Sequence, residues 1–238
     1  EATGVLHKYQ GRALLITTGA CAINCRYCFR RHFPYAQENA ASNQWNSAIN
    51  YLQEDESIEE LILSGGDPLS LSTSKLRSLS DLLKPIKHIQ RLRFHTRLTV
   101  VLPERIDQEF INWITELPYQ IVFVIHANHA NELDNSVGDA MQKLKATTGA
   151  TLLNQSVLLK GVNDNTDDLV LLSNRLFDFG VLPYYLHLLD KVHGVAHFSV
   201  PIEQAKTILN EMLAKLPGYL VPKLVQEIAG QANKTPII

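Results

Sequence analysis

The sequence predicts an α/β protein whose strands form a partial, TIM-like (β/α)6 barrel. Short apolar runs rich in β-branched and aromatic residues alternate with longer segments that have helical spacing. Strict alternation of this kind is typical of a parallel sheet with right-handed crossovers. Polar residues also gather where the apolar runs end, and in a β/α barrel the carboxyl ends of the strands form one face that builds the active site.

Six apolar runs are the predicted strands, and they span residues 12–19, 60–66, 90–97, 120–127, 151–159 and 182–189. One helix is expected from about Thr166 to Phe179, because Gly180 favours the left-handed cap that ends a helix. Another is expected over 201–216, with Pro201 in its first turn and apolar residues recurring three and four positions apart. Six strand–helix units would leave the barrel open on one side, with room for a bulky cofactor and a substrate. No linker or repeat divides the chain, so we expect one domain over residues 1–238.

The polar residues at the strand ends indicate one shared site. Loops are polar in any β/α protein, so a single polar strand end means little, but the coincidence extends over several consecutive strands. In chain order these residues are the cysteine loop after the first strand, Ser64-Gly65-Gly66-Asp67-Pro68, His95-Thr96-Arg97, His126-Ala127-Asn128-His129, Asn154 and Gln155 within the fifth strand, and His187 and Asp190.

Charge and composition exclude several classes of protein. A formal net charge of −2 gives no basic field for sequence-independent binding to nucleic acid or to anionic membranes. No apolar run approaches the length of a membrane span, and no signal-peptide pattern is present. Three closely spaced cysteines cannot form a disulfide framework, which favours the reducing cytoplasm. The chain begins at Glu1 without a methionine, so we expect it to be a piece of a longer protein.

All three cysteines lie in one stretch, GACAINCRYCFRRHF, as Cys21, Cys25 and Cys28. This CxxxCxxC spacing is one ligand short of the usual four-thiolate iron–sulfur site, so a cluster held here would keep one iron open for chemistry. Two alternatives remain: a zinc site formed with one histidine, such as His32, and three structural cysteines in a buried turn. Cysteines packed only for burial have no reason to follow this spacing.

The cysteine motif directly after the first strand of a β/α barrel resembles the radical S-adenosylmethionine (SAM) superfamily. The resemblance extends over nearly the whole chain to the lysine 2,3-aminomutase family. It is similar above all to short bacterial members that make β-lysine for the modification of translation elongation factor P. The stretches that carry it are HKYQGRALL, CAINCRYCFRRHFPYA, LILSGGDPLSL, HTRLTVVLPERI, NQSVLLKGVND, PYYLHLLDKVHGVAHF and GYLVPKLVQEIAGQANKTP.

The resemblance implies a barrel of the radical SAM type and an isomerase that moves the amino group of L-α-lysine from carbon 2 to carbon 3. It also implies that the family's N-terminal and C-terminal extensions are missing from this chain. Three cofactors follow from it: a [4Fe-4S] cluster, SAM and pyridoxal 5′-phosphate (PLP). The cofactors supply the difficult chemistry and the protein positions them.

The resemblance assigns residues to each cofactor. The cluster would be bound by Cys21, Cys25 and Cys28, and PLP by Lys234, with its phosphate on Lys8, Tyr9 and Arg12. SAM would be bound by Ser64, Gly65, Gly66, Asp67, His126 and Gln155. His129 is the alternative to His126, since both belong to one HANH segment.

The substrate residues follow in the same way. Arg30 would bind the α-carboxylate of the substrate through two parallel hydrogen bonds. A lysine side chain in place of Arg30 would make this bidentate contact poorly. Asp190 and Glu227 would hold the distal amine, and Glu227 stands where related aminomutases have an aspartate. The glutamate side chain is longer, so it keeps the negative charge but places it at a different position.

The implied partners are L-lysine, an electron donor of the flavodoxin or ferredoxin type, a functional link to the ligase of elongation factor P, and a second copy of the chain in a homo-oligomer. Three rival functions remain. An aminomutase for another amino acid would change the two acidic residues. A PLP-independent radical SAM enzyme would have no use for Lys8, Arg12 and Lys234. A zinc-stabilised module that binds RNA or protein would need a basic or aromatic face, which the charge balance does not support.

Overall fold

The computed structural model describes residues 2–35, 45–228, 231 and 233–237, and their strands form one sheet. The sheet has nine strands in sequential order. The pairs from β2 to β8 are parallel, and β1 and β9 pair antiparallel at the two edges. The strands are β1 Val5–Tyr9, β2 Arg12–Thr18, β3 Glu60–Gly65, β4 Arg91–Thr96, β5 Gln120–Ile125, β6 Thr151–Val157, β7 Leu182–His187, β8 Lys223–Gln226 and β9 Thr235–Pro236.

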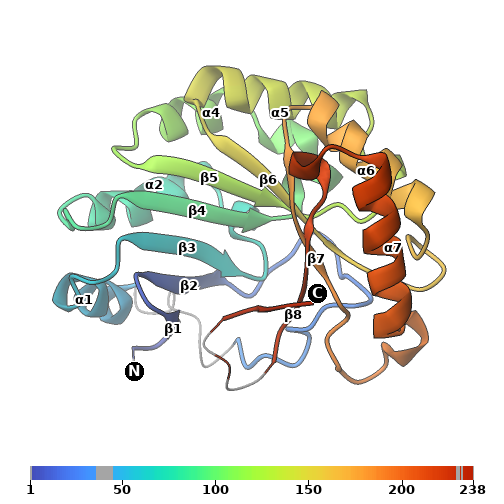
Figure 1. Ribbon diagram of the computed structural model, residues 1–238. Helices are drawn as coiled ribbons and strands as arrows, with labels where there is room; N and C mark the ends of the chain where they lie inside the picture. The colour runs from blue at the N-terminus through green and yellow to red at the C-terminus, as the bar shows by residue number, and fades with distance from the viewer. Residues whose placement is uncertain (1, 36–44, 229–230, 232, 238) are drawn as a thin grey trace.

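Six strand–helix units run from β2 to α7, which confirms the predicted partial barrel. Figure 1 shows the curved sheet with the helices on its outer side. The α-helices are α1 Asn46–Glu54, α2 Thr73–Leu83, α3 Leu98–Val101, α4 Gln108–Thr115, α5 Asn135–Thr148, α6 Thr166–Asp178 and α7 Ile202–Lys215. Short 3-10 turns are η2 Pro68–Ser70, η3 Pro103–Arg105, η4 Ala130–Glu132, η5 Ala196–Phe198 and η6 Gly218–Leu220.

The sequence analysis missed three strands, all of them short and at the ends of the sheet. β1 carries Lys8 and Tyr9, which the sequence analysis placed before the first strand. β8 spans Lys223–Gln226, and β9 is Thr235–Pro236, beside Lys234. Strands of two to five residues give too few positions for a hydrophobic period to stand out. Of the stretch GYLVPKLVQEIAGQANKTP, residues 229, 230 and 232 lie outside the described part of the chain.

The two helix predictions hold within the usual variation of helix ends. α6 ends at Asp178, and Gly180 follows with φ +76°, the left-handed conformation expected of it. α7 begins at Ile202, and Pro201 is the residue before its first turn rather than within it.

Alternation along the strands sets which side chains enter the barrel. In β4 the buried residues Leu92, Phe94 and Thr96 alternate with Arg91, Arg93 and His95. Phe94 packs on Phe123 with ring centroids 4.8 Å apart and on Trp113 at 5.9 Å, which places this face of the strand against α4. Because successive side chains point to opposite faces, Arg93 and His95 project to the inner side. The aromatic core therefore fixes which polar residues face the interior.

Candidate active site

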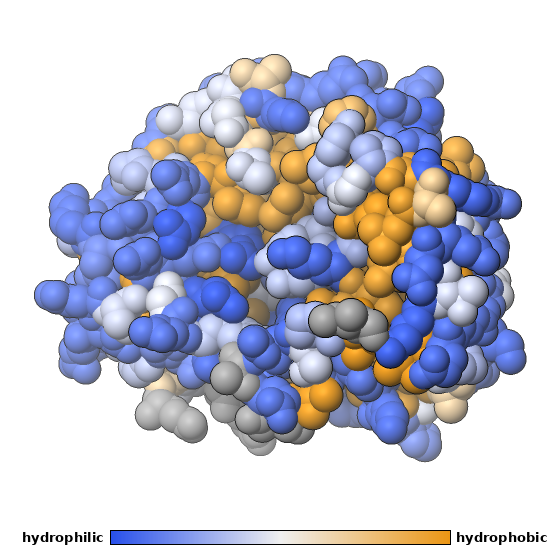
Figure 2. Space-filling view, in the orientation of Figure 1, coloured by the Kyte–Doolittle hydropathy of each residue, from blue (hydrophilic) through white to orange (hydrophobic). Residues whose placement is uncertain are grey.

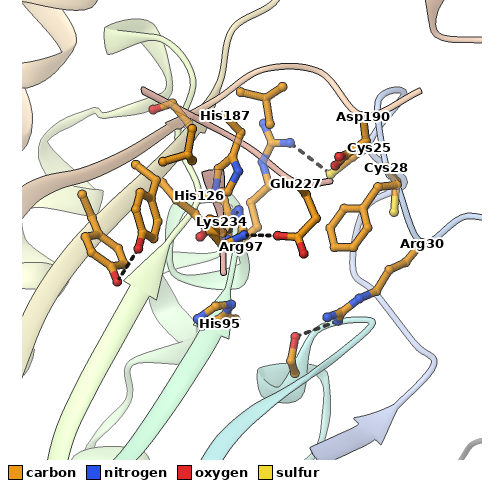
Figure 3. Close-up of a pocket in the computed structure, with 18 of the residues that line it drawn as sticks. Cys25, Cys28, Arg30, His95, Arg97, His126, His187, Asp190, Glu227 and Lys234 are labelled. Atoms are coloured by element: carbon orange, nitrogen blue, oxygen red, sulfur yellow. Dashed lines mark hydrogen bonds and ion pairs between the residues drawn. The ribbon is translucent and has the colours of Figure 1, made fainter. Parts of the chain in front are cut away.

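A cavity of about 1300 Å³ occupies the inner side of the partial barrel. Every residue that the sequence analysis assigned to the cluster, SAM, PLP or the substrate lines it. These residues are Lys8, Tyr9, Arg12, Cys21, Cys25, Cys28, Arg30, Ser64, Gly65, Gly66, Asp67, His126, Gln155, Asp190, Glu227 and Lys234. Figure 3 labels ten of the residues around this space: Cys25, Cys28, Arg30, His95, Arg97, His126, His187, Asp190, Glu227 and Lys234. Hydrophobic residues form part of the molecular surface near β7 and α7 (Figure 2), where Leu209, Leu213 and Val221 line the same cavity.

The cysteine loop begins where β2 ends and forms one wall of the cavity. Cys21 is exposed, and Cys25 and Cys28 are half-buried. Within the described residues, no three His, Cys, Asp or Glu side chains converge on a position for one metal ion. A cluster spreads its thiolates over different iron atoms, which suits three thiols on one loop.

Negative charge gathers around the first cysteine. Although Cys21 is exposed as a residue, partial burial of its thiol raises the pKa to about 11. The negative charges of Asp67, Cys28 and Cys25 act in the same direction, and Arg30 opposes them. Thiols must lose their protons to bind metal, so the positive charge of bound iron would offset this repulsion.

Arg30 joins the cysteine loop to the loop after β3. Its Nη1 donates to Ser64 Oγ at 2.8 Å and to the Gly65 carbonyl at 3.0 Å. Tyr35 donates to the same carbonyl at 2.8 Å. Burial lowers the pKa of Arg30, although a guanidinium keeps its proton in proteins. The residue assigned to the substrate carboxylate thus also contacts the loop assigned to SAM.

The Gly65-Gly66 pair allows two backbone segments to touch. Gly65 has φ +123°, and a Cβ there would lie 2.4 Å from the Thr18 carbonyl oxygen. A Cβ at Gly66 would lie 2.3 Å from the Ala20 carbonyl oxygen. Since no side chain fits at these distances, the glycines bring the loop against the start of the cysteine loop.

Asp67 holds this loop in place. Its carboxylate accepts hydrogen bonds from Thr96 Oγ1 at 2.7 Å and from the backbone N–H groups of Leu69, Arg97 and Leu98 at 3.0, 2.7 and 3.0 Å. Burial nevertheless raises its pKa. These protein donors give Asp67 a structural role at the site, beside the SAM contact that the sequence analysis assigned to it.

The HANH segment places His126, and not His129, in the cavity. Gln155 Nε2 donates to the His126 imidazole, 3.0 Å from Nε2. Burial lowers the pKa of His126 to about 3, with help from the positive charges of Arg97, Arg30 and Lys234. His129 instead accepts a hydrogen bond from the Asn131 N–H at the start of η4, so its ring serves the local turn.

A second charged cluster joins β1 to the C-terminal part of the chain. Lys8 Nζ lies 2.6 Å from Glu227 Oε1, and Tyr9 OH lies 3.5 Å from the same carboxylate. Arg12 lies over the Tyr9 ring at 4.3 Å. The structure therefore gives Lys8 a carboxylate partner, whereas the sequence analysis assigned it to phosphate.

The two acidic residues of this cluster differ in their environment. The pKa of Glu227 is lowered, because Lys8 and Lys234 outweigh the effect of its partial burial. Burial raises the pKa of Asp190, and the charge of Lys234 opposes that shift. Both residues and Lys234 line the same cavity (Figure 3).

Several residues that line the cavity were assigned to no cofactor or substrate from the sequence, although His95, Arg97 and His187 were among the polar residues at the predicted strand ends. The unassigned residues are Tyr27, Arg93, His95, Arg97, Tyr185 and His187. Burial lowers the pKa of His187 to about 3 and that of His95 well below its usual range. The ring of Tyr185 lies 5.8 Å from Lys234 Nζ. Strict alternation within β4 was an available signal for Arg93 and His95, because it places these polar side chains on the inner face.

Comparison with known proteins gives concordant results. Residues 10–143 match the family described as a 4Fe-4S single cluster domain. The chain is 51% identical over 234 residues to the L-lysine 2,3-aminomutase of Escherichia coli (strain K12), covering 98% of this chain and 68% of that protein. It is 52% identical over 231 residues to the L-lysine 2,3-aminomutase of Haemophilus influenzae, with coverage of 97% and 68%. The enzyme of that name from Clostridium subterminale is 35% identical over 237 residues, with coverage of 99% and 56%.

Among solved structures, a radical SAM methyltransferase from Sphaerobacter thermophilus superposes with a TM-score of 0.65. The alignment covers 96% of this chain and 69% of that one at 14% identity, so it establishes the fold alone. None of the helices in the described residues has the length and apolar character that crossing a membrane requires.

Proposed function

Because the chain belongs to the L-lysine 2,3-aminomutase family, we propose that it is a PLP-dependent radical SAM isomerase that converts L-α-lysine to β-lysine. The observation that supports this best is the convergence on one cavity of residues assigned from separate stretches of the sequence. We further propose that the β-lysine serves the modification of elongation factor P.

The cysteine loop and its neighbours suit a cluster that binds SAM. Three thiols on one loop supply the ligands, and Ser64, Gly65 and Gly66 lie beside them. SAM bound to the open iron would supply a 5′-deoxyadenosyl radical. The contribution of this chain is to place the loop through Asp67 and Arg30, because a radical about one ångström astray would reach the wrong hydrogen.

A second set of residues in the cavity suits PLP. Lys234 lies among neutral histidines and the Tyr185 ring, and Arg12 supplies a guanidinium of the kind that phosphate binds well. PLP, when bound, would carry the migrating amino group. Lys234 would hold the cofactor, and Tyr9 and Arg12 would orient its phosphate.

The charges in the cavity suit lysine as the substrate. Arg30 is cationic and would bind the α-carboxylate, while Asp190 and Glu227 would bind the distal ammonium group. An aminomutase for a neutral or acidic amino acid would have no use for two carboxylates at that end. This pair of acids favours a substrate with a cationic side chain, as lysine has.

The test is an anaerobic assay of the reconstituted protein with PLP, SAM, a reductant and L-lysine. We expect β-lysine and 5′-deoxyadenosine to appear together by mass spectrometry. Deoxyadenosine without β-lysine would retain the radical SAM half of the proposal and refute the substrate. Cluster assembly with neither product would refute the activity of the chain in this form.

A further inference from the structure

The guanidinium of Arg97 lies against a cysteine of the cluster loop. Its Nη1 donates to Cys25 Sγ at 3.1 Å and to Tyr27 OH at 2.6 Å, and its Nη2 contacts Glu132 Oε2 at 2.5 Å. The dashed line from Arg97 to Cys25 in Figure 3 marks the first of these. The side chain is only 18% exposed, so solvent screens these contacts little.

The two oxygen partners of Arg97, Tyr27 and Glu132, are themselves fixed by further hydrogen bonds. Tyr27 OH also accepts from Asn128 Nδ2 at 2.6 Å, and Asn128 Oδ1 accepts from the Val157 N–H at 2.8 Å. Glu132 Oε1 accepts from the N–H groups of Asn128 and His129 at 2.7 and 3.1 Å. The network therefore joins the cysteine loop to the ends of β4, β5 and β6. It also fixes the orientation of the Arg97 guanidinium.

Two further observations indicate that Arg97 acts on the site and is not only the structural partner of Glu132. It lines the cavity together with Cys25 and Tyr27. Its Nε is buried and has no hydrogen-bond partner in the described part of the chain. A residue needed only to pair with Glu132 would gain nothing from donating to a sulfur atom as well.

We propose that Arg97 tunes the reduction potential of the cluster through its N–H contact with Cys25, and that Glu132 opposes it. This rests on the proposed function only in requiring a [4Fe-4S] cluster on the three cysteines. One-electron reduction adds negative charge to the cluster and its sulfur ligands. A hydrogen bond and a positive charge at one sulfur stabilise the reduced form more than the oxidised form, and so raise the potential.

Reduction of the cluster forms and breaks no covalent bond of the protein. A chemical reductant such as dithionite gives one electron to the cluster, the thiolates stay bound to iron, and Arg97 keeps its proton because guanidinium does not titrate in this range. Arg97 is a positioning residue in this account. Its effect should be visible in the cluster alone, before SAM or substrate is added.

The test compares midpoint potentials of the reconstituted protein without SAM, by anaerobic redox titration followed by electron paramagnetic resonance. Arg97→Gln should lower the ratio of reduced to oxidised cluster at least tenfold at a fixed solution potential, a negative shift of about 59 mV for one electron. Glu132→Gln should shift the potential the opposite way, because it removes the opposing charge and keeps an acceptor for the backbone N–H groups. Arg97→Lys should give a smaller negative shift.

Arg91→Gln is the matched control, since Arg91 lies at the other end of β4 and pairs with exposed Glu59. Its potential should equal that of the wild type. An unchanged potential in Arg97→Gln at full iron content would overturn the proposal, and so would shifts of the same sign in Arg97→Gln and Glu132→Gln. If Arg97→Gln fails to assemble a cluster, the signs for Arg97→Lys and Glu132→Gln decide. Failure of the wild type to assemble any [4Fe-4S] cluster would instead refute the proposed function.

Discussion

Glu227 Oε2 lies 3.3 Å from Nζ of Lys234, seven residues later in the chain. The other oxygen of the same carboxylate lies 2.6 Å from Lys8 Nζ, so one acid holds together β1 and the segment that leads into β9. The residue proposed to bind the distal amine of the substrate is thus paired with two lysines of the protein. An incoming ammonium group must take the place of at least one of them.

Loss of the Glu227 charge should weaken lysine binding. Glu227→Gln removes a charged hydrogen-bond acceptor, a contact worth about 1.5–3 kcal/mol. We expect KM for lysine to rise about tenfold or more with a smaller change in kcat, since 1.4 kcal/mol corresponds to a factor of ten. Glu227→Asp keeps the charge and should retain most of the affinity. Glu56→Gln, at an exposed position, is the control and should match the wild type. An unaltered KM in Glu227→Gln would assign the distal amine to other residues.

Replacement of Lys234 should abolish the binding of PLP and leave the iron–sulfur cluster in place. Lys234→Ala takes away the amine that is proposed to bind PLP, so the absorbance of protein-bound PLP should disappear. The visible spectrum of the cluster should persist, because the cysteine loop is built on β2 and does not depend on the C-terminal segment. Lys215→Ala, on the exposed side of α7, serves as control and should retain PLP. Persistence of the PLP absorbance in Lys234→Ala would refute the assignment.

The contact between the Gly66 loop and the cysteine loop should be sensitive to one methyl group. Gly66→Ala places a Cβ 2.3 Å from the Ala20 carbonyl oxygen, so one of the two backbones must move. Overpacking of this kind costs about 1–3 kcal/mol. We expect SAM to bind at least tenfold more weakly in an equilibrium binding assay. Gly218→Ala, whose Cβ would meet nothing within 4 Å, should bind SAM normally. Equal affinity for SAM in both variants would show that the glycine pair does not determine SAM binding.

The half-buried histidines of the cavity should make the protein sensitive to mild acid. His126 and His187 have an ordinary pKa of 6.5, and burial lowers it to about 3 in the folded state. Below pH 6.5 the unfolded chain binds protons that the folded chain does not, so the free energy of unfolding falls as the pH decreases toward 3. Each such histidine contributes about 1.4 kcal/mol per pH unit in that window.

Urea unfolding between pH 6.5 and 5, without added SAM or PLP, measures this dependence. His187→Asn should reduce the slope of the unfolding free energy against pH by about one proton. The slope isolates the titration, because a packing change alone shifts the free energy at every pH by the same amount. A slope identical to that of the wild type would show that His187 takes up its proton in the folded protein.

Local patterns in the sequence determined the order of strands and helices in the barrel. The six apolar runs became β2 to β7, and glycine and proline marked the ends of α6 and α7, because strand period and helix capping depend on residues close together in the chain. The cysteine spacing marked the metal loop for the same reason. The roles assigned to Lys8, Lys234 and Glu227 came from family resemblance, since a lysine near a chain end has no local pattern that distinguishes it.

Tertiary structure alone decided which side chains meet. Lys8 and Glu227 are 219 residues apart, and the short strands β1 and β8 that bring them together have no clear period of their own. Of two histidines in HANH, only the backbone direction after β5 turns His126 inward. Arg97 reaches Cys25 because the carboxyl ends of β2 and β4 open on the same side of the barrel. Such contacts depend on how distant segments converge in space, which a local pattern does not encode.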